Sequence, residues 1–114
     1  MNRDPAYLQD ILTSALAATE YLRGLSRRKF IATREKQDAV IRSLEVIGEA
    51  ARRLSQEGKD ALPDIPWQKL TGMRNILIHQ YDNVDLDLVY DTVKENLPTL
   101  IERLTSSLEG GGRP

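Results

Sequence analysis

The segment QDAVIRSLEVIGEAARRL, residues 37–54, has the hydrophobic periodicity of an amphipathic α-helix. Its apolar residues recur every three or four positions and predict one buried stripe, made of Val40, Leu44, Ile47, Ala51 and Leu54. A polar stripe is offset by two positions, about 200° around the helix axis, and consists of Asp38, Arg42, Glu45, Glu49 and Arg52. We therefore expect a helix that begins near Thr33, as its cap, and continues to about Gln56.

Gly48 interrupts this helix at an interior position. A glycine there costs about 1 kcal/mol relative to alanine, so a compensating interaction is expected. The simplest one is close approach by the backbone of another helix. Together with Ala50 and Ala51, Gly48 forms a surface of small residues that can seat such a helix.

A second helix is predicted at the start of the chain. Asp4 followed by Pro5 is a typical helix beginning, with the carboxylate as the cap and the proline where its missing N–H costs nothing. The helix should end near Arg23, before Gly24. Its apolar stripe consists of Leu8, Ile11, Ala15, Ala18, Leu22 and Leu25.

Two more helices are predicted after the prolines Pro63 and Pro66. One begins at Pro66–Trp67 and runs toward His79. It contains the apolar run 76–78, so we expect it to be central and buried on nearly all sides. The other begins after Asp85 as its cap, and Pro98 should kink or split it at residues 94–97 because proline removes a helical hydrogen bond.

The predicted fold is all-α. No segment alternates with period two, so no sheet is expected. Amphipathic helices joined by short connections favour an up-and-down antiparallel bundle of four to five helices. We expect residues 1–108 to form one domain and residues 109–114, which include Gly110–Gly112, to form a disordered tail.

Composition excludes several classes of site. The chain has 114 residues, a formal net charge of −1, no cysteine and one histidine, so thiolate chemistry and a multi-histidine metal cage are excluded within one protomer. No group of acidic residues has the spacing of an ion-binding loop, and we expect neither metal nor cofactor. No apolar run is long enough to span a bilayer, and the first residues contain no apolar signal region, which predicts a soluble cytoplasmic protein.

Charge is unevenly distributed along the chain. Residues 23–36 contain six basic residues and one acid, whereas residues 82–95 contain five acids and one lysine. A phosphate-rich ligand could use the basic segment, but a solvated connection between helices is the more common explanation of such a run.

The stretch RNILIHQYDN, residues 74–83, contains the only histidine. On a continuous helix, Arg74 and His79 are five positions apart and point about 140° away from each other. They can act together only if the chain turns back near His79 or if two protomers share the site. Without further information, a lone histidine near a helix ending is more often a satisfied polar group than a catalyst.

The chemistry of these residues nevertheless suits RNA. Arg74 can hold phosphate oxygens through its planar guanidinium, and His79 can transfer a proton. Together they are sufficient for metal-free cleavage in which the ribose 2′-hydroxyl attacks the adjacent phosphate. Asn75 can orient the phosphate or the imidazole, and Tyr81 can stack on a base, act as a nucleophile or accept a modification.

The segment GMRNILIHQYDNVDLDLVYDTV, residues 72–93, resembles the HepT family of the HEPN superfamily, whose RxxxxHxY motif is matched by Arg74, His79 and Tyr81. The similarity extends over residues 37–54, over LPDIPW at 62–67 and over the opening DPAYLQDI, and thus covers nearly the whole chain.

The resemblance implies a helical homodimer in which the motifs of both protomers face one cleft. It implies a ribonuclease toxin, with Arg74 and His79 catalytic and Asn75 supporting them. It also implies an antitoxin partner, an MntA-like minimal nucleotidyltransferase that silences the nuclease by adenylylating Tyr81. Bulky anionic AMP groups beside Arg74 and His79 would fill the phosphate site and repel RNA.

Some alternatives remain open at this point. Asp38, Arg42 and Glu49 can line the cleft, but an exposed salt-bridged face is the more common role of such residues. The protein can also be a non-catalytic helical subunit that presents Tyr81 to the nucleotidyltransferase, because its net charge lacks a strong basic footprint. The third alternative is a helical bundle without a site.

Overall fold

The computed structural model describes residues 2–79 and 83–110, which are helical with short connections and contain no strand. The elements follow in the order α1 (Asp4–Tyr21), α2 (Arg27–Ile31), α3 (Arg34–Arg53), α4 (Gln56–Asp60), α5 (Trp67–His79), α6 (Leu86–Asp91), the π-helix η2 (Thr92–Asn96) and α7 (Leu97–Gly110).

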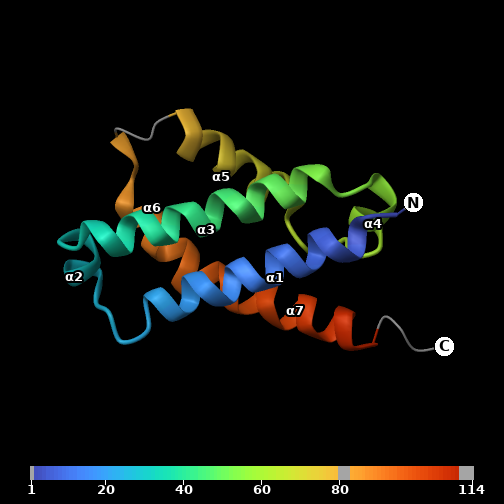
Figure 1. The fold of residues 1–114 in the computed structure, drawn as a ribbon, viewed down its shortest axis with the longest axis horizontal. Helices are drawn as coiled ribbons and strands as arrows, with labels where there is room; N and C mark the ends of the chain where they lie inside the picture. The colour runs from blue at the N-terminus through green and yellow to red at the C-terminus, as the bar shows by residue number, and fades with distance from the viewer. Residues whose placement is uncertain (1, 80–82, 111–114) are drawn as a thin grey trace.

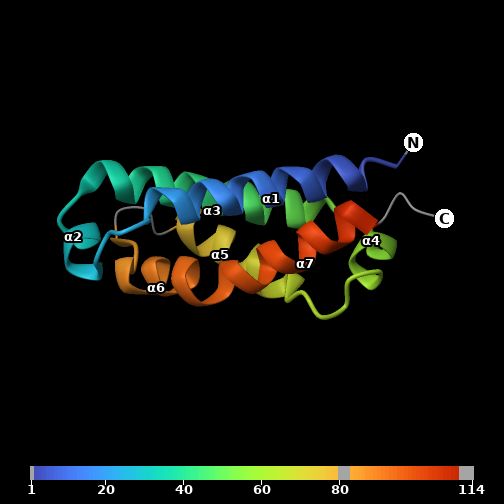
Figure 2. The same cartoon turned by 90° about the horizontal axis from the view of Figure 1, so that it is seen from below.

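The long elements follow an up-and-down antiparallel path. In Figure 1, α1 and α3 run side by side in opposite directions, α7 lies along α1, and α5 lies on the other side of α3. Figure 2 shows α1 and α3 in one layer and the α6–η2–α7 segment in a second. The all-α prediction is therefore confirmed. No helix within residues 2–79 and 83–110 combines the length and apolar character needed to cross a membrane.

The short helices α2 and α4 were not predicted, and they raise the helix count above the expected four to five. Each begins after a serine cap. The hydroxyl oxygen of Ser26 accepts a hydrogen bond from the Lys29 N–H, and that of Ser55 accepts one from the Gly58 N–H. With these caps, the segments expected to be plain connections before and after α3 each form one short helix.

The predicted stripe of α3 is confirmed as the centre of the core. All five of its residues are buried, as are Ile11, Ala15 and Ala18 of α1 and Leu22, which directly follows α1. The second layer contributes Val89, Val93, Leu97, Leu100 and Leu104. Apolar faces of α1, α3 and the α6–η2–α7 segment thus form one contiguous core.

The prediction that α5 is central is wrong. Within α5 only Trp67 and Leu77 are buried, while Ile76 and Ile78 are 44% and 39% exposed. The apolar run 76–78 spreads around the helix, and α5 packs along one side against α3. Part of this run is therefore left on the surface.

The prediction that the Asp4 carboxylate caps its own helix is also wrong. Asp4 is the first residue of α1, and its own N–H donates a hydrogen bond to Oδ1 of Asn2 at 2.9 Å. Its buried carboxylate instead accepts hydrogen bonds from the backbone N–H of Ser55, at 3.0 Å, and from the Ser55 hydroxyl. Asp4 thus ties the start of α1 to the cap of α4, and these hydrogen bonds hold the pKa of Asp4 below its ordinary value of 3.8.

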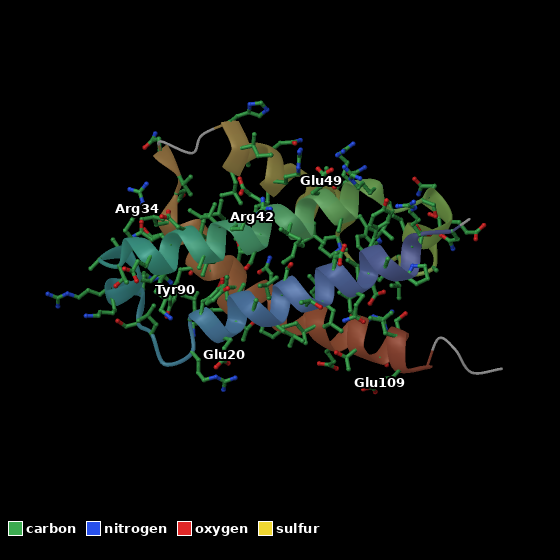
Figure 3. All side chains as sticks on the ribbon, in the orientation of Figure 1. Glu20, Arg34, Arg42, Glu49, Tyr90 and Glu109 are labelled. Atoms are coloured by element: carbon green, nitrogen blue, oxygen red, sulfur yellow. The ribbon has the colours of Figure 1, made fainter. Side chains whose placement is uncertain are left out.

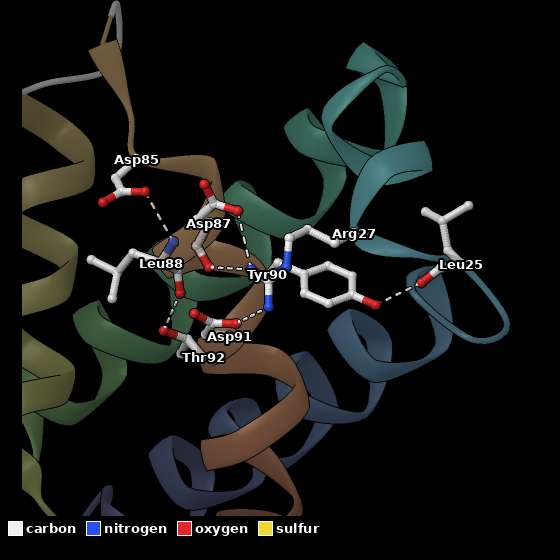
Figure 4. Close-up of polar contacts among 8 residues, drawn as sticks. All are labelled: Leu25, Arg27, Asp85, Asp87, Leu88, Tyr90, Asp91 and Thr92. Atoms are coloured by element: carbon white, nitrogen blue, oxygen red, sulfur yellow. Dashed lines mark hydrogen bonds and ion pairs between the residues drawn. The ribbon is translucent and has the colours of Figure 1, made fainter.

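The basic and acidic segments of the sequence meet in space. Figure 4 shows Arg27 of α2 between Asp87 and Asp91 of α6, with nitrogen–oxygen distances of 3.1 and 2.6 Å. The Arg27 guanidinium also lies over the Tyr90 ring, and the Tyr90 hydroxyl donates a hydrogen bond to the carbonyl of Leu25 at 2.9 Å. Part of the predicted basic end is therefore neutralised by contacts within the chain.

The last predicted helix is divided as expected. The Asp85 carboxylate caps it by accepting a hydrogen bond from the Leu88 N–H at 3.1 Å. The π-helix Thr92–Asn96 lies just before Pro98. Proline has no N–H to donate to the preceding turn, and the wider turn of the π-helix accommodates this break in the hydrogen-bond pattern. Helix α7 then continues through Gly110, so Glu109 and Gly110 are helical rather than part of the expected tail, whose remaining residues lie outside the described residues.

At Gly48, α5 approaches α3 closely, and the position of this glycine in the sequence predicts such an approach. A Cβ at Gly48 would overlap the Cβ of Arg74 and would lie 2.8 Å from the carbonyl oxygen of Leu70. Both atoms belong to or adjoin the backbone of α5, so they cannot move without moving the helix. The missing side chain therefore sets the distance between the two helices.

The substitution Gly48→Ala should reduce the free energy of unfolding. Overpacking costs about 1–3 kcal/mol, which exceeds the gain in helix propensity of about 1 kcal/mol. Gly72 provides the matched control, because a Cβ there meets nothing within 4 Å in the described part of the chain. Gly72→Ala should leave the stability unchanged or raise it. Urea denaturation of both variants measures the difference, and equal stabilities would contradict the close approach.

Removal of the Asp4 carboxylate should produce a pH-dependent loss of stability. Since its pKa is lowered by folding, its contribution is present above pH 3.8 and is lost as the pH falls through the folded pKa. Asp4→Ala should cost about 1.5–3 kcal/mol at neutral pH, and the difference from the wild type should shrink in acid. Asp10→Ala, an exposed change on the same helix, is the control in denaturation series at several pH values. Equal losses for the two variants at neutral pH would refute the role of Asp4.

Candidate functional site

An open groove of about 520 Å³ lies among α1, α3 and α5. Figure 3 shows Arg42 and Glu49 on the side of α3 that faces α5. The groove combines cationic, anionic and apolar side chains, and its lining consists of Tyr7, Asp10, Arg42, Glu45, Val46, Glu49, Ala50, Arg53, Arg74 and Ile78.

Arg74 is held against the wall of this groove. The approach of α5 to Gly48 places the Cβ of Arg74 directly over α3, and its side chain is only 25% exposed. The Arg74 Nε lies 2.8 Å from Oε1 of Glu49. Its Nη1 donates a hydrogen bond to Oδ1 of Asn75 at 3.2 Å. The guanidinium is thus oriented by one neighbour on α3 and one on α5.

Glu49 is the common partner of three arginines. Besides Arg74, its carboxylate pairs with Arg52 and Arg53, each at 2.7 Å. Hydrogen bonds from Arg52 and Arg53 lower the pKa of Glu49 to about 2, and the charges of Arg52 and Arg74 act in the same direction, whereas desolvation opposes them. Glu49 is therefore ionised at neutral pH, and the cluster holds three positive charges around one negative charge.

His79 does not share the groove with Arg74. It is the last residue of α5 and is exposed, and it is not among the groove's lining residues. Because α5 is one continuous helix across both residues, their side chains point about 140° apart. Within one chain the two motif residues therefore face different directions, as the sequence predicts for a continuous helix.

Asn75 lies on α5 between the direction of the Arg74 side chain and that of His79. It is not among the lining residues of the groove itself; its Oδ1 accepts the Arg74 hydrogen bond, and it lines a second hollow together with Gln68 and Gly72. Asn75 is four positions before His79, so both project from the same face of α5. Neither residue is buried.

The three residues predicted to line a cleft fall into two groups. Arg42 and Glu49 line the groove with Arg74. Asp38 lines an adjoining groove that shares Arg42 with the first, and it forms an exposed ion pair with Arg34 at 3.1 Å. Asp38 and Glu49 therefore form ion pairs, as the alternative of a salt-bridged face predicts, and one of those of Glu49 is with Arg74. Tyr81, the predicted modification site, lies outside the described residues.

Arg53 was missed by the sequence analysis. It is four positions after Glu49, a spacing at which oppositely charged side chains on a helix meet, so this pair could have been predicted. Tyr7 and Asp10 of α1 also line the groove, and no local pattern indicates that they lie near Arg74. Within residues 2–79 and 83–110, no group of three or more potential metal ligands occurs.

Comparison with known proteins identifies the family. The family described as "Ribonuclease HepT-like" matches residues 11–106. A Methanocaldococcus jannaschii protein named as a candidate RNase is 40% identical over 95 residues, which cover 83% of this chain and 87% of the relative. A Thermococcus cleftensis protein named as a candidate ribonuclease HepT is 39% identical over 94 residues, which cover 82% of this chain and 86% of the relative. No solved structure is significantly similar to the chain. The sequence resemblance is thereby confirmed, and this chain belongs to the HepT-like ribonuclease family.

Proposed function

We propose that this protein is a metal-independent endoribonuclease, the toxin of a toxin–antitoxin pair, with a composite site at a homodimer cleft. The observation that carries the proposal is the placement of Arg74, held in a groove with its guanidinium oriented by Glu49 and Asn75. Such an arginine suits a phosphodiester, because a planar fork can bind two phosphate oxygens at once. Membership of the HepT-like ribonuclease family supports RNA as the substrate.

The reaction we propose is attack of the ribose 2′-oxygen on the adjacent phosphorus. The O2′–P bond forms, the P–O5′ bond breaks, one proton leaves the 2′-hydroxyl and one is added to the departing 5′-oxygen. Arg74 stabilises the charge on the pentavalent phosphorus centre, and His79 transfers a proton. Asn75 supports Arg74 through the hydrogen bond between them.

A second protomer supplies what one chain lacks. Arg74 and His79 diverge on α5, so a single copy does not present both to one phosphate. The exposed Ile76 and Ile78 lie on the same helix and favour burial against another surface. In a two-fold dimer each protomer offers its α5, so the arginine of one chain can act with the histidine of the other.

The proposed control of this site is covalent. An MntA-like minimal nucleotidyltransferase would adenylylate Tyr81, whose hydroxyl oxygen attacks the α-phosphorus of ATP while pyrophosphate leaves. Tyr81 follows His79 by two positions, so an attached AMP adds an anionic phosphate next to the residues that must bind RNA. Because the proposed reactions need ATP and RNA, we place the protein and its proposed partner in the cytoplasm.

The purified protein should cleave RNA in the presence of EDTA, and Arg74→Ala and His79→Ala should each reduce the rate by about 100-fold or more. Gel analysis of a labelled RNA measures the rates, and circular dichroism checks that the variants are folded. Arg103→Ala is the matched control, since it removes an arginine that pairs with Asp64 outside the groove. Wild-type protein without cleavage, or folded variants as active as the wild type, would refute the nuclease.

The same two variants show whether protomers share a site. An Arg74→Ala protomer paired with a His79→Ala protomer retains one intact arginine and one intact histidine. If each active site combines the arginine of one chain with the histidine of the other, mixing the two inactive proteins under subunit exchange should restore activity. Continued inactivity of a verified heterodimer would indicate that each chain forms its own site.

One observation favours the second candidate function, a non-catalytic subunit that presents Tyr81 to the nucleotidyltransferase. The groove around Arg74 also holds the carboxylates of Asp10, Glu45 and Glu49, and the net charge of the chain is −1. These charges weaken long-range attraction for RNA. A subunit of this kind would be modified but would not cleave.

Incubation with the cognate nucleotidyltransferase and ATP should add mass in whole AMP units, and Tyr81→Phe should abolish the addition. Intact-protein mass spectrometry measures it, and Tyr90→Phe serves as the control for a tyrosine elsewhere in the fold. Modified wild type should lose RNA cleavage under the nuclease proposal. AMP found on Tyr81→Phe, or full cleavage by the modified protein, would contradict the proposed control.

A further inference from the structure

The carboxylate of Glu49 on α3 pairs with three guanidinium groups, and one of them, that of Arg74, lies on α5, the motif helix. Its Oε2 accepts hydrogen bonds from Nη2 of Arg52 and Nε of Arg53, both at 2.7 Å, and its Oε1 lies 2.8 Å from Nε of Arg74. Arg52 and Arg53 are one turn after Glu49 on the same helix. They therefore hold the carboxylate from its own helix, while Arg74 reaches it from α5.

This arrangement selects which edge of Arg74 is available. A guanidinium has five N–H donors in a fixed plane. Glu49 faces Nε, and Asn75 accepts one N–H of Nη1. The end-on edge formed by Nη1 and Nη2 still has donors, and this edge matches two oxygens of a phosphate.

We propose that Glu49 is a positioning residue, which fixes the Arg74 guanidinium by its Nε so that the end-on edge meets the scissile phosphate. The inference rests on the proposed nuclease function. Because the arginine loses its rotamer freedom when the chain folds, that freedom need not be lost when the transition state forms. Glu49 itself touches no reacting atom in this role.

The arginines beside Glu49 explain why a carboxylate is tolerated near an RNA phosphate. A lone Glu49 would repel the phosphate, but Arg52 and Arg53 add two positive charges next to it. The cluster of Glu49 with Arg52, Arg53 and Arg74 therefore keeps a net positive charge. Arg52 and Arg53 thus hold the carboxylate in place, and they also offset its negative charge.

The main rival is an inhibitory carboxylate that RNA must displace from Arg74. The two roles give opposite results for Glu49→Gln, which keeps the shape of the side chain and removes its charge. A positioning role predicts that kcat falls by about 10- to 100-fold while KM stays the same or decreases. An inhibitory role predicts faster cleavage.

Glu20→Gln is the matched control. Glu20 also pairs with an arginine three positions later, Arg23, at 2.7 Å, and it lies on α1 away from the groove. This variant should retain the kcat and KM of the wild type. Thermal melts of both variants separate a loss of fold from a loss of position, since exposed ion pairs of this kind contribute little to stability.

A second measurement does not require activity. In ¹⁵N NMR, the Nε–H signal of Arg74, identified by its loss in Arg74→Lys, should exchange slowly with water in the wild type and in Glu20→Gln. It should exchange fast in Glu49→Gln. A wild-type protein that does not cleave RNA would end the nuclease proposal, yet the exchange rates would still decide whether Glu49 holds Arg74. Folded Glu49→Gln with wild-type kcat, faster cleavage or unchanged exchange of this signal would overturn the inference.

If Glu49→Gln does not fold, the double variant Arg52→Gln/Arg53→Gln tests the same link from the other end. It leaves Glu49 and Arg74 in place but removes the hydrogen bonds that hold the carboxylate. The Nε–H of Arg74 should then exchange faster, and kcat should fall. Slow exchange and an unchanged kcat in this variant would equally overturn the inference.

Discussion

The absence of a side chain at Gly48 allows two helices to come closer than any other residue would permit. The Leu70 carbonyl and the Arg74 Cβ occupy the space that a Cβ at this position would need. Close packing of this kind transmits small displacements, because interiors have few voids into which a shifted helix can relax. The next residue, Glu49, then lies within ion-pair distance of Arg74. Two adjacent residues of α3 thus meet the motif helix, Gly48 at its backbone and Glu49 at the guanidinium of Arg74.

The motif helix is otherwise held by few buried contacts. The core is built by α1, α3 and the α6–η2–α7 segment, while α5 contributes Trp67 and Leu77. Trp67 anchors the start of α5, where its indole N–H donates to the carbonyl of Leu62 at 3.1 Å. Toward His79 the helix becomes more exposed. Elements with few buried contacts open at lower free energy than a core, and they suit a surface that must bind a substrate or a second protein.

The distribution of charge in this protein depends on which side chains meet in the fold, and it differs from the distribution along the sequence. The basic and acidic stretches of the sequence suggest two electrostatic ends, yet Arg27 joins them through Asp87 and Asp91. Around Glu49, by contrast, cations exceed anions within one small region. A net charge near zero therefore coexists with a local positive cluster beside the motif arginine.

The long helices, the buried stripe of α3, the need for close approach at Gly48 and the divergence of Arg74 and His79 all follow from the sequence, since they depend on helical periodicity and on local backbone chemistry. The family also follows from it. Only the tertiary structure decided that α5 is peripheral, that Asp4 binds Ser55 rather than capping its own helix, and that Glu49 joins Arg53 to Arg74. These features depend on which faces of distant segments meet. Periodicity determines that a helix has an apolar face, but the packing of the whole chain determines what covers it.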